Sequence, residues 1–505
     1  MISLLTHDFF SGFPLLFLAL SACFFLSFFS FFFSKAVIIN SQKKHFVIKH
    51  YAFNITLLII AFTFIIELNT PIQNYSSFWG FLNFDFYSHS LSLIVLFLSF
   101  LSFLSSRSYI ITKFSFTFEY FFLILFGIFS LIGLPACSDF LGIYLFLELQ
   151  SLIFYTLACF NRSSAFSTEA GVKYFIMGAF SSGILLFGMS LIYGMCGSLN
   201  FEILKTLLFY FSEATFSFNY FVTYFGFFLI VCSFLFKLSA APFHFWSPEV
   251  YEGSVAPVSL FFAVVPKIAL FGSLVRISVG VFFEFSAFWT VLFAIVAFLS
   301  LLFGSFSALA QKKVKKFLAF SSVTHVGFII AALSAHSFDG LVGLFFYLLV
   351  YSFLSLCFWS FVVLMHKEKN SSFLVDFKIL AKQNPFIGGS LCILLFSIAG
   401  IPPLSGFGAK FFSFIAVVEQ NEFLLAVVIV LFAVVSCFYY LRVIKWIFFD
   451  NSSNAVTIQS NYNLTFTFSR LEAYLISFSL FISSILFMLP DFCMLVAHRM
   501  ALSLF

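Results

Sequence analysis

Residues 236 to 246 read FKLSAAPFHFW and place Lys237 beside a proline, inside an apolar run long enough to cross a membrane. Residues 399 to 412 read AGIPPLSGFGAKFF and repeat the pattern around Lys410. Proline removes a backbone N–H and clashes with the preceding helical turn, so both segments are predicted to unwind. Unwound backbone is tolerated at membrane depth only where it lines protein or water. The two stretches therefore predict broken membrane helices around hydrated sites. The helix-breaking residues are Pro242, Pro402 and Pro403.

The rest of the chain has the composition of a polytopic membrane protein. Of its 505 residues, 62% are hydrophobic and only 9% are charged, which excludes an ordinary soluble domain. The apolar runs are long and continuous, unlike the short alternating strands of a membrane β-barrel. We therefore predict an all-α fold with about fourteen transmembrane helices. The spans are expected near residues 12–34, 51–67, 84–104, 118–135, 139–160, 168–194, 220–246, 256–282, 287–309, 317–335, 340–365, 386–418, 423–448 and 471–490.

The basic residues of the loops indicate the orientation. When the loops are assigned alternately to the two sides, 18 Lys and Arg residues fall on one side and 3 on the other. Loops on the cytoplasmic or matrix side carry the excess of positive charge. The basic loop at residues 312–316 is therefore predicted to face that side, and both termini the outer side.

The two broken spans indicate an internal repeat. Lys237 and Lys410 lie 173 residues apart, and each belongs to the fourth span of a unit of five. An odd number of spans inverts the second copy, as in many transporters. The broken helices would be the seventh and the twelfth. The predicted divisions are an N-terminal three-helix segment (1–117), two inverted five-helix repeats (118–282 and 283–448) and a C-terminal helix and tail (449–505).

Four lysines lie inside the predicted spans, where a charge at the bilayer centre costs roughly 2.5 to 3.5 kcal/mol and marks a functional site by default. Lys237 and Lys410 sit beside the predicted breaks. Lys267 follows Pro266 about 12 residues into its span, too deep to reach the interface easily. Lys173 is six residues into its span, so two interpretations stay open for it: an interfacial anchor or a member of a proton path.

Glu148, in YLFLELQSL, is the one acid expected in the middle of a span. An unpaired carboxylate there would be costly, so we expect a lysine partner, with Lys237 at the helix break as the candidate. His325, in SSVTHVGFII, lies between the two broken helices and is open to two interpretations, a core histidine or a proton relay. Lysines bridged by His325 and water would pass protons along the membrane plane. We interpret His89, near the start of the third span, as structural.

The sequence gives no sign of chemistry centred on this chain. The connections between the spans are too short for a soluble domain. No Gly-rich phosphate loop follows a strand pattern, and no spaced set of His and Cys resembles a metal site. We therefore expect no catalytic, cofactor-binding or metal-binding residues here, so any redox centre or nucleotide site would belong to a partner.

Several long segments resemble the antiporter-like subunit 2 family of NADH:ubiquinone oxidoreductase, respiratory complex I. The resemblance is dense over residues 118–450, and the closing HRMALSLF is similar to the mitochondrially encoded form. The segments are LELQSL, FSTEAGVKYFIMGAFSSGILLFGMSLIYG, FKLSAAPFHFWSPEVYEGSVAPVS, PKIALF, KKVKKFLAFSSVTHVGF, AGIPPLSGFGAKFF and CFYYLRV.

The resemblance implies a place in the mitochondrial inner membrane, as a multi-pass subunit whose termini face the intermembrane space. It implies partners in the complex I membrane arm and contact with membrane lipids, and it gives no reason to expect nucleic acid. The chain itself would hold no cofactor, with FMN, iron–sulfur clusters and ubiquinone in partner subunits. The residues that match the lysines and glutamate of the family are Glu148, Lys173, Lys237, Lys267 and Lys410.

The function expected from these residues and this resemblance is proton translocation coupled to NADH:ubiquinone oxidoreduction, through a buried relay of lysine, glutamate and histidine. The chain would then be a subunit of a proton-translocating NADH:ubiquinone reductase without a catalytic centre of its own. Two alternatives share the same residues. One is a free-standing cation/proton antiporter, and the other is a structural scaffold of the membrane arm whose charges carry no protons.

Overall fold

A computed structural model describes residues 2–37, 42–71, 75–113, 117–213, 218–368, 373–449 and 470–504. These residues are almost all helical, and the sheet found among them is a short two-stranded hairpin. The chain forms two compact units, which are described separately below. The first comprises Met1–Ser239, Gly253–Val291 and His498–Phe505, and the second Ala240–Glu252 and Leu292–Ala497. The four segments predicted from the sequence follow the internal repeat, and they stay a prediction.

The helices confirm the predicted all-α membrane fold. In the described residues, 12 helices are long and apolar enough to cross a membrane, or 13 if α20 (Arg470–Met488) and α21 (Asp491–Leu502) form one bent span. The span predicted at 386–418 is present as two shorter helices, α16 (Pro385–Ala399) and α17 (Ser405–Glu419). The predicted number of about fourteen counts this broken span and the bent pair as one span each.

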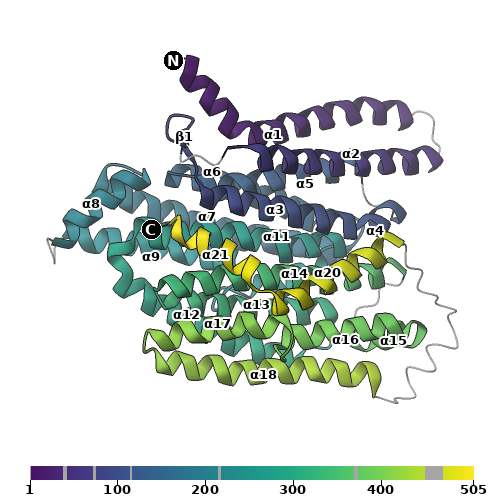
Figure 1. Ribbon diagram of the computed structural model, residues 1–505. Helices are drawn as coiled ribbons and strands as arrows, with labels where there is room; N and C mark the ends of the chain where they lie inside the picture. The colour runs from purple at the N-terminus through teal and green to yellow at the C-terminus, as the bar shows by residue number, and fades with distance from the viewer. Residues whose placement is uncertain are drawn as a thin grey trace. The chain divides into compact units, whose positions relative to one another are not determined.

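In the first unit, the N-terminal helices α1, α2 and α3 lie side by side (Figure 1), and the β1–β2 hairpin connects α2 to α3. Long apolar runs explain why these segments form helices, since a helix satisfies every backbone polar group within the membrane. The elements of this unit are α1 (Ile2–Val37), α2 (Gln42–Asn69), β1 (Tyr75–Ser77), β2 (Leu82–Phe84), α3 (Phe86–Ser105), α4 (Arg107–Thr112), α5 (Phe118–Gly133), η1 (Leu134–Ala136), α6 (Phe140–Ala158), α7 (Ala165–Cys196), α8 (Phe201–Glu213), α9 (Phe218–Lys237), α11 (Ala256–Val275), η2 (Arg276–Val281) and η3 (Phe283–Phe285).

Helix α11 is the core of the first unit, because every one of its residues is buried. Helix α3 packs against it, and Leu91 of α3 occupies the space beside Gly272, where an added Cβ would lie 2.5 Å from the leucine. The Tyr87 hydroxyl also donates to the Gly272 carbonyl at 2.7 Å. At the start of α3, Asp85 forms a reciprocal capping box with Ser88, which satisfies the free N–H groups of the first turn. These contacts hold α11, and Lys267 on it, against α3.

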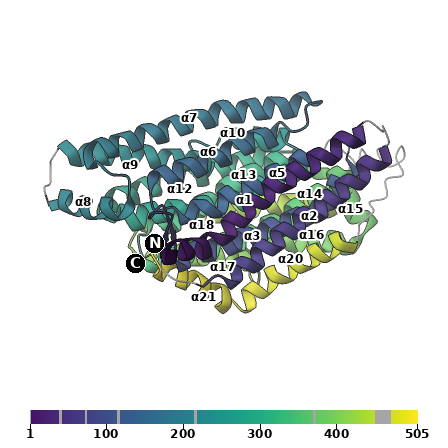
Figure 2. The same cartoon turned by 90° about the horizontal axis from the view of Figure 1, so that it is seen from above.

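Helices α7 and α9 also pack closely in the first unit (Figure 2). A Cβ added to Gly188 would lie 2.8 Å from the Gly226 carbonyl oxygen, and one added to Gly226 would lie 2.9 Å from that of Gly188. Small residues let membrane helices approach until their backbones touch. This close crossing fixes the helix that ends at Lys237.

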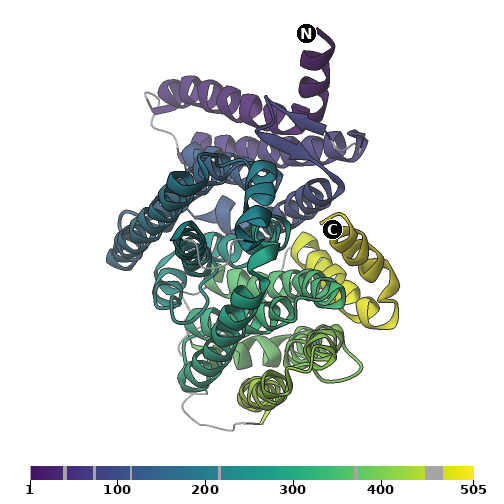
Figure 3. The same cartoon turned by 90° about the vertical axis from the view of Figure 1, so that its left-hand side faces the viewer.

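In the second unit, α13 is almost wholly buried and forms the core. Figure 3 views the green and yellow-green helices of this unit nearly end-on. Helices α14 and α18 both pack against α13 and supply the side chains that face His325. The remaining helices, of which α10 and α12 begin or end in the first unit, are α10 (Trp246–Gly253), α12 (Ser286–Ala310), α13 (Val314–Ser334), α14 (Phe338–Glu368), η4 (Leu374–Asp376), α15 (Phe377–Gln383) and α18 (Phe423–Phe448).

Both predicted helix breaks are present. Helix α9 ends at Lys237, and residues 238–245, which include Pro242, form turns before α10 begins. Helix α16 ends at Ala399, and Gly400 follows with a φ of +87°, a left-handed conformation that glycine adopts without a steric cost. Pro402 and Pro403 occupy the turn before α17. Each break leaves carbonyl groups without helical partners.

Candidate functional site

The first unit contains four of the predicted relay residues. Lys267 lies on the buried helix α11 and is 3% exposed, so its side chain does not extend to the surface of the chain. Lys237 is the last residue of α9, and Glu148 lies in the middle of α6. Both of these are half-buried. Lys267 is the twelfth residue of α11, and its depth in the membrane stays a prediction.

Glu148 and Lys237 lie close enough for the carboxylate charge to act on the ammonium group. Within the described residues, no ion pair of 4.0 Å or less joins them. The Glu148 carboxylate instead accepts a hydrogen bond of 3.4 Å from the Ser151 hydroxyl. The direct form of the predicted pair is therefore not observed, and a water-bridged contact stays a prediction.

Lys173 has a different partner from the one that a relay requires. Its ammonium group forms an ion pair of 2.6 Å with Glu169, one helical turn earlier on α7. The side chain of Lys173 is 43% exposed and that of Glu169 58% exposed. An exposed pair of this kind contributes little to stability. The structure thus brings Lys173 together with an acid on its own helix, and its assignment to the relay stays a prediction.

In the second unit, Lys410 is 7% exposed and held by neutral acceptors. Its ammonium group donates to the Ala399 carbonyl oxygen at 2.7 Å and to the Ser436 hydroxyl at 2.8 Å. Ala399 is the last residue of α16, so Lys410 satisfies a carbonyl that the helix break leaves free. The ammonium group also lies 5.3 Å from the centre of the Phe328 ring, a favourable distance for a cation–π contact.

His325 is 6% exposed and lies between two tyrosine hydroxyls. Nδ1 is 2.9 Å from the hydroxyl of Tyr347 on α14, and Nε2 is 3.2 Å from that of Tyr440 on α18. A neutral imidazole has one donor and one acceptor, so one tyrosine donates to it and the other accepts. Reversing these roles passes one proton through the ring when the donating tyrosine regains a proton from a neighbouring group and the accepting tyrosine passes its own proton on. Such an arrangement can carry a proton between α14 and α18.

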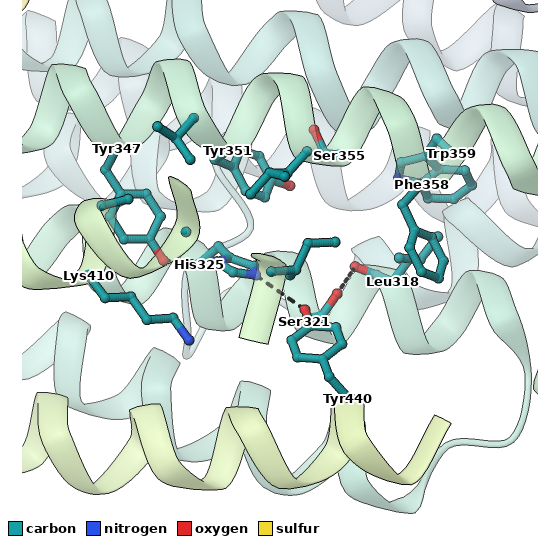
Figure 4. A pocket seen from close by; sticks show the side chains of 15 residues that line it. Leu318, Ser321, His325, Tyr347, Tyr351, Ser355, Phe358, Trp359, Lys410 and Tyr440 are labelled. Carbon is teal, nitrogen blue, oxygen red and sulfur yellow. Dashed lines mark hydrogen bonds between the residues drawn. The ribbon is translucent and has the colours of Figure 1, made fainter. Parts of the chain in front are cut away.

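Lys410 and His325 line the same cavity. Figure 4 shows Lys410 and Tyr347 at one end, Phe358 and Trp359 at the other, and His325 between them. A cavity with several polar groups can hold ordered water, since each water needs two to four polar partners. Ser321, Tyr351, Ser355 and Tyr440 supply further hydroxyl groups along it.

The tyrosines of this cavity were not singled out from the sequence. Tyr440 lies in the CFYYLRV segment, and Tyr347 and Tyr351 are four residues apart on α14. That spacing places two tyrosines on one face of a helix, which was the available signal. Tyrosine is common in ordinary cores, however, and only the contacts with His325 distinguish these residues.

Outside the spans, an ion-pair cluster joins α10 to the basic loop that begins α13. The Glu252 carboxylate binds the ammonium group of Lys313, and that of Lys316 at 3.0 Å. Burial would raise the pKa of Glu252, but its hydrogen bonds and charge interactions with the two lysines hold that pKa below its ordinary value. In the part of the chain that the structure describes, no group of three His, Cys, Asp or Glu side chains is arranged to hold a metal ion.

The comparisons with known proteins agree on one family. A family described as NADH:quinone oxidoreductase/Mrp antiporter, TM, matches residues 136–436. NADH-ubiquinone oxidoreductase chain 2 of Marchantia polymorpha is 38% identical over 387 residues, 77% of this chain and 77% of that relative. NADH-quinone oxidoreductase subunit N of Rhodospirillum rubrum is 38% identical over 337 residues, 66% of this chain and 68% of that relative.

A solved structure supports the same fold. A chain of respiratory complex I from Thermus thermophilus with bound Aureothin has a TM-score of 0.74, with 24% identity, and the alignment covers 96% of this chain and 99% of that one. All six predicted relay residues fall inside the range matched by the family, 136–436. The helices α1, α2 and α3 fall outside it.

Proposed function

The chain belongs to the family of antiporter-like membrane subunits that includes NADH-ubiquinone oxidoreductase chain 2 and NADH-quinone oxidoreductase subunit N, and from this premise we propose that it carries protons across the membrane. It is a multi-pass membrane subunit of a complex I type oxidoreductase. The single observation that supports proton transfer best is the cavity in which His325, two tyrosine hydroxyls and Lys410 meet.

The chemistry of that cavity suits a proton carrier. Lys410 can change its charge, whereas its two hydrogen-bond partners cannot, because a carbonyl oxygen and a serine hydroxyl stay neutral. A lysine without a fixed counter-ion can lose its proton without leaving a charge unpaired. His325 and the tyrosines offer the next positions for that proton. We propose Lys410 as the terminal element of the path, on the outer side.

The first unit would supply the other half of the path. Lys267 is buried at the centre of its unit, and the charge of Glu148 reaches Lys237. A buried lysine near a carboxylate is a group whose charge can be switched when the ion pair opens or closes. We propose that Glu148, Lys173, Lys237 and Lys267 respond in this way to redox chemistry elsewhere in the complex.

We also propose the location and partners of the chain. FMN, iron–sulfur clusters and ubiquinone would lie in partner subunits, so this chain would contribute no catalytic centre. The loop at 312–316 would face the mitochondrial matrix and both termini the intermembrane space. Thiol labelling in sealed inner-membrane vesicles tests this orientation, and labelling of the basic loop and the C-terminus from the same side would contradict it.

Two alternatives are separated by experiment. A free-standing cation/proton antiporter would purify alone, whereas a subunit migrates only in a very large assembly with flavin and iron–sulfur partners. The family description covers both oxidoreductase and antiporter subunits, so this measurement matters. A structural scaffold would tolerate loss of its buried lysines without loss of pumping.

The decisive experiment is Lys410→Met in the intact complex. Methionine keeps most of the apolar stem but removes the titratable group, so the complex should assemble while proton pumping per NADH oxidised falls by about tenfold or more. Lys445→Met is the matched control, because Lys445 is exposed at the end of α18, which also carries Ser436. Normal pumping in assembled Lys410→Met complex would contradict the relay and favour the scaffold.

A further inference from the structure

The N-terminal helices contain a buried acid that the proposed path does not use. Glu67, near the end of α2, is only 4% exposed. The sequence placed it at the last position of a span, where a carboxylate would be expected to reach water. The helix instead continues to Asn69, and α3 packs along α2. Glu67 therefore lies inside the first unit, in the part of the chain outside the range matched by the family.

The carboxylate has one hydrogen-bond donor and one nearby titratable group. The Ser92 hydroxyl of α3 donates to Glu67 Oε1. His89, one turn earlier on α3, lies close enough for its charge to act on the carboxylate. Its Nε2 is 2.8 Å from the backbone carbonyl oxygen of Glu67. The His89 ring is thus held by the backbone of Glu67, and the Glu67 carboxylate by the Ser92 hydroxyl.

The carbonyl contact fixes the protonation of the imidazole. A carbonyl oxygen only accepts, so His89 Nε2 must carry a proton and donate it. The remaining nitrogen, Nδ1, is the one that gains or loses a proton. The hydrogen bond described for the His89 ring is made by Nε2, and His89 is half-buried. A proton can therefore reach His89 from water while Glu67 stays enclosed.

No other described charge compensates Glu67. Arg276 is already paired with another acid, Asp85 at the start of α3, at 2.7 Å. Arg107 on α4 contacts His50 at the far end of α2. Lys49 is also at that end, about 27 Å away along the helix at 1.5 Å per residue. Further charged residues on the packed helices are Lys267, deep on α11, and Glu119, at the exposed start of α5. Helix α1 also packs against α2, and its Asp8 and Lys35 lie near its two ends.

An ionised carboxylate enclosed without a cation costs several kcal/mol. A protonated imidazole beside a neutral acid likewise has no negative charge to pair with. The stable states are then a neutral acid with neutral His89, or a carboxylate with protonated His89. Both states contain one more proton than the carboxylate and neutral imidazole together. We propose that Glu67, His89 and Ser92 form a further proton-binding site, which exchanges one proton with water through His89.

Infrared difference spectroscopy of the intact complex in membranes tests this site during a pH titration. The C=O stretch of a protonated carboxyl group should appear as the pH falls and disappear as the pH rises, because the site then loses the proton that its two stable states share. The band should be absent in Glu67→Gln and retained in Glu119→Gln, which removes an exposed acid of the same unit. In His89→Gln the band should persist to a pH about one unit higher or more, because glutamine cannot compensate the carboxylate.

Ser92→Ala keeps both titratable groups and removes only the hydroxyl that binds Glu67 Oε1. It should change the frequency of the band, and it identifies the band even if Glu67→Gln complexes do not assemble. The proposal is wrong if the Glu67 carboxyl group is protonated, or ionised, over the whole range in which the complex is stable. Pumping is not the readout, so failure of this site and failure of the Lys410 relay are separate results.

Discussion

Each broken span places a lysine at the C-terminal end of a helix, but the two spans do so in different ways. Lys237 is the last residue of α9, and thus lies in the final turn of the helix before the first break. Lys410 lies beyond the second break, on α17, but its ammonium group reaches back to the carbonyl of Ala399, the last residue of α16. The C-terminal end of a helix carries partial negative charge, which favours a cation. The second break thus supplies a free helical carbonyl to Lys410, whereas the first places Lys237 at the last position of its helix.

The two sites differ in what surrounds the lysine. Glu148 brings a negative charge to Lys237, whereas the hydrogen bonds described for Lys410 go to a neutral carbonyl and a neutral hydroxyl. An opposite charge favours the protonated lysine, and a neutral acceptor favours it much less. We therefore infer different roles for the two lysines. Lys237 keeps its proton until its ion pair opens, whereas Lys410 releases its proton readily.

The largest effect is expected when the second site is made to resemble the first. Ser436→Asp would place a carboxylate where a hydroxyl now accepts from Lys410 at 2.8 Å. A carboxylate in contact favours the charged lysine by about ten- to a thousandfold, so proton release and pumping should nearly stop in assembled complex. Ser436→Ala is the matched control, because it removes only one hydrogen bond and should lower pumping slightly. Equal pumping in the two variants would contradict the difference drawn between the sites.

A smaller effect is expected when the first site loses its acid. Glu148→Gln keeps the size and hydrogen-bonding capacity of the side chain but removes the charge that acts on Lys237. Pumping per NADH oxidised should fall by about tenfold, which corresponds to about 1.4 kcal/mol of lost coupling. Glu119→Gln is the control, since it removes an exposed acid of the same unit, and Glu169→Gln tests the other acid–lysine pair, because Glu169 pairs with Lys173. A larger loss in Glu169→Gln would assign the switch to Lys173.

The sequence predicted what depends on local chemistry. Proline breaks a helix wherever it occurs, so Pro242, Pro402 and Pro403 predicted both breaks. The long apolar runs predicted the membrane fold. The ion pair of Lys173 with Glu169 was also readable, because the two residues are four apart on a helix. Glu169 lies at the start of the predicted span 168–194, where a carboxylate is ordinary, so it did not stand out.

Contacts between distant helices could not be read in this way. His325 meets Tyr440, which is 115 residues later, and Glu67 meets Ser92 across a helix pair. His89 was interpreted as structural because its partner lies on the preceding span, and sequence spacing alone does not give the rotation of one helix against another. The lysines were found because charge is rare at that depth, whereas tyrosine and serine are common there.

The smallest effect concerns Glu252, which ties α10, the helix after the first break, to the basic loop. Its pKa is held below the ordinary value, so its pairs with Lys313 and Lys316 stabilise the fold above the ordinary carboxyl pKa of about 4.3. That stabilisation is lost as the pH falls through the lower folded value. Because these side chains are partly exposed, the pairs are worth only about 0.2 to 1 kcal/mol.

Hydrogen exchange of residues 312–317, corrected for the intrinsic effect of pH, measures this contribution. Exchange in wild type should rise by about 1.4- to fivefold on acidification, since RT is about 0.59 kcal/mol and the pairs are weak. In Glu252→Gln the faster exchange should already be present at neutral pH, with no further step in acid. Asp339→Asn, which neutralises an exposed acid of the same unit, should behave like wild type. In the described residues, no ion pair of this kind joins the second break to a neighbouring loop. If exchange of residues 400–406 rose equally on acidification, the rise in residues 312–317 would not come from Glu252.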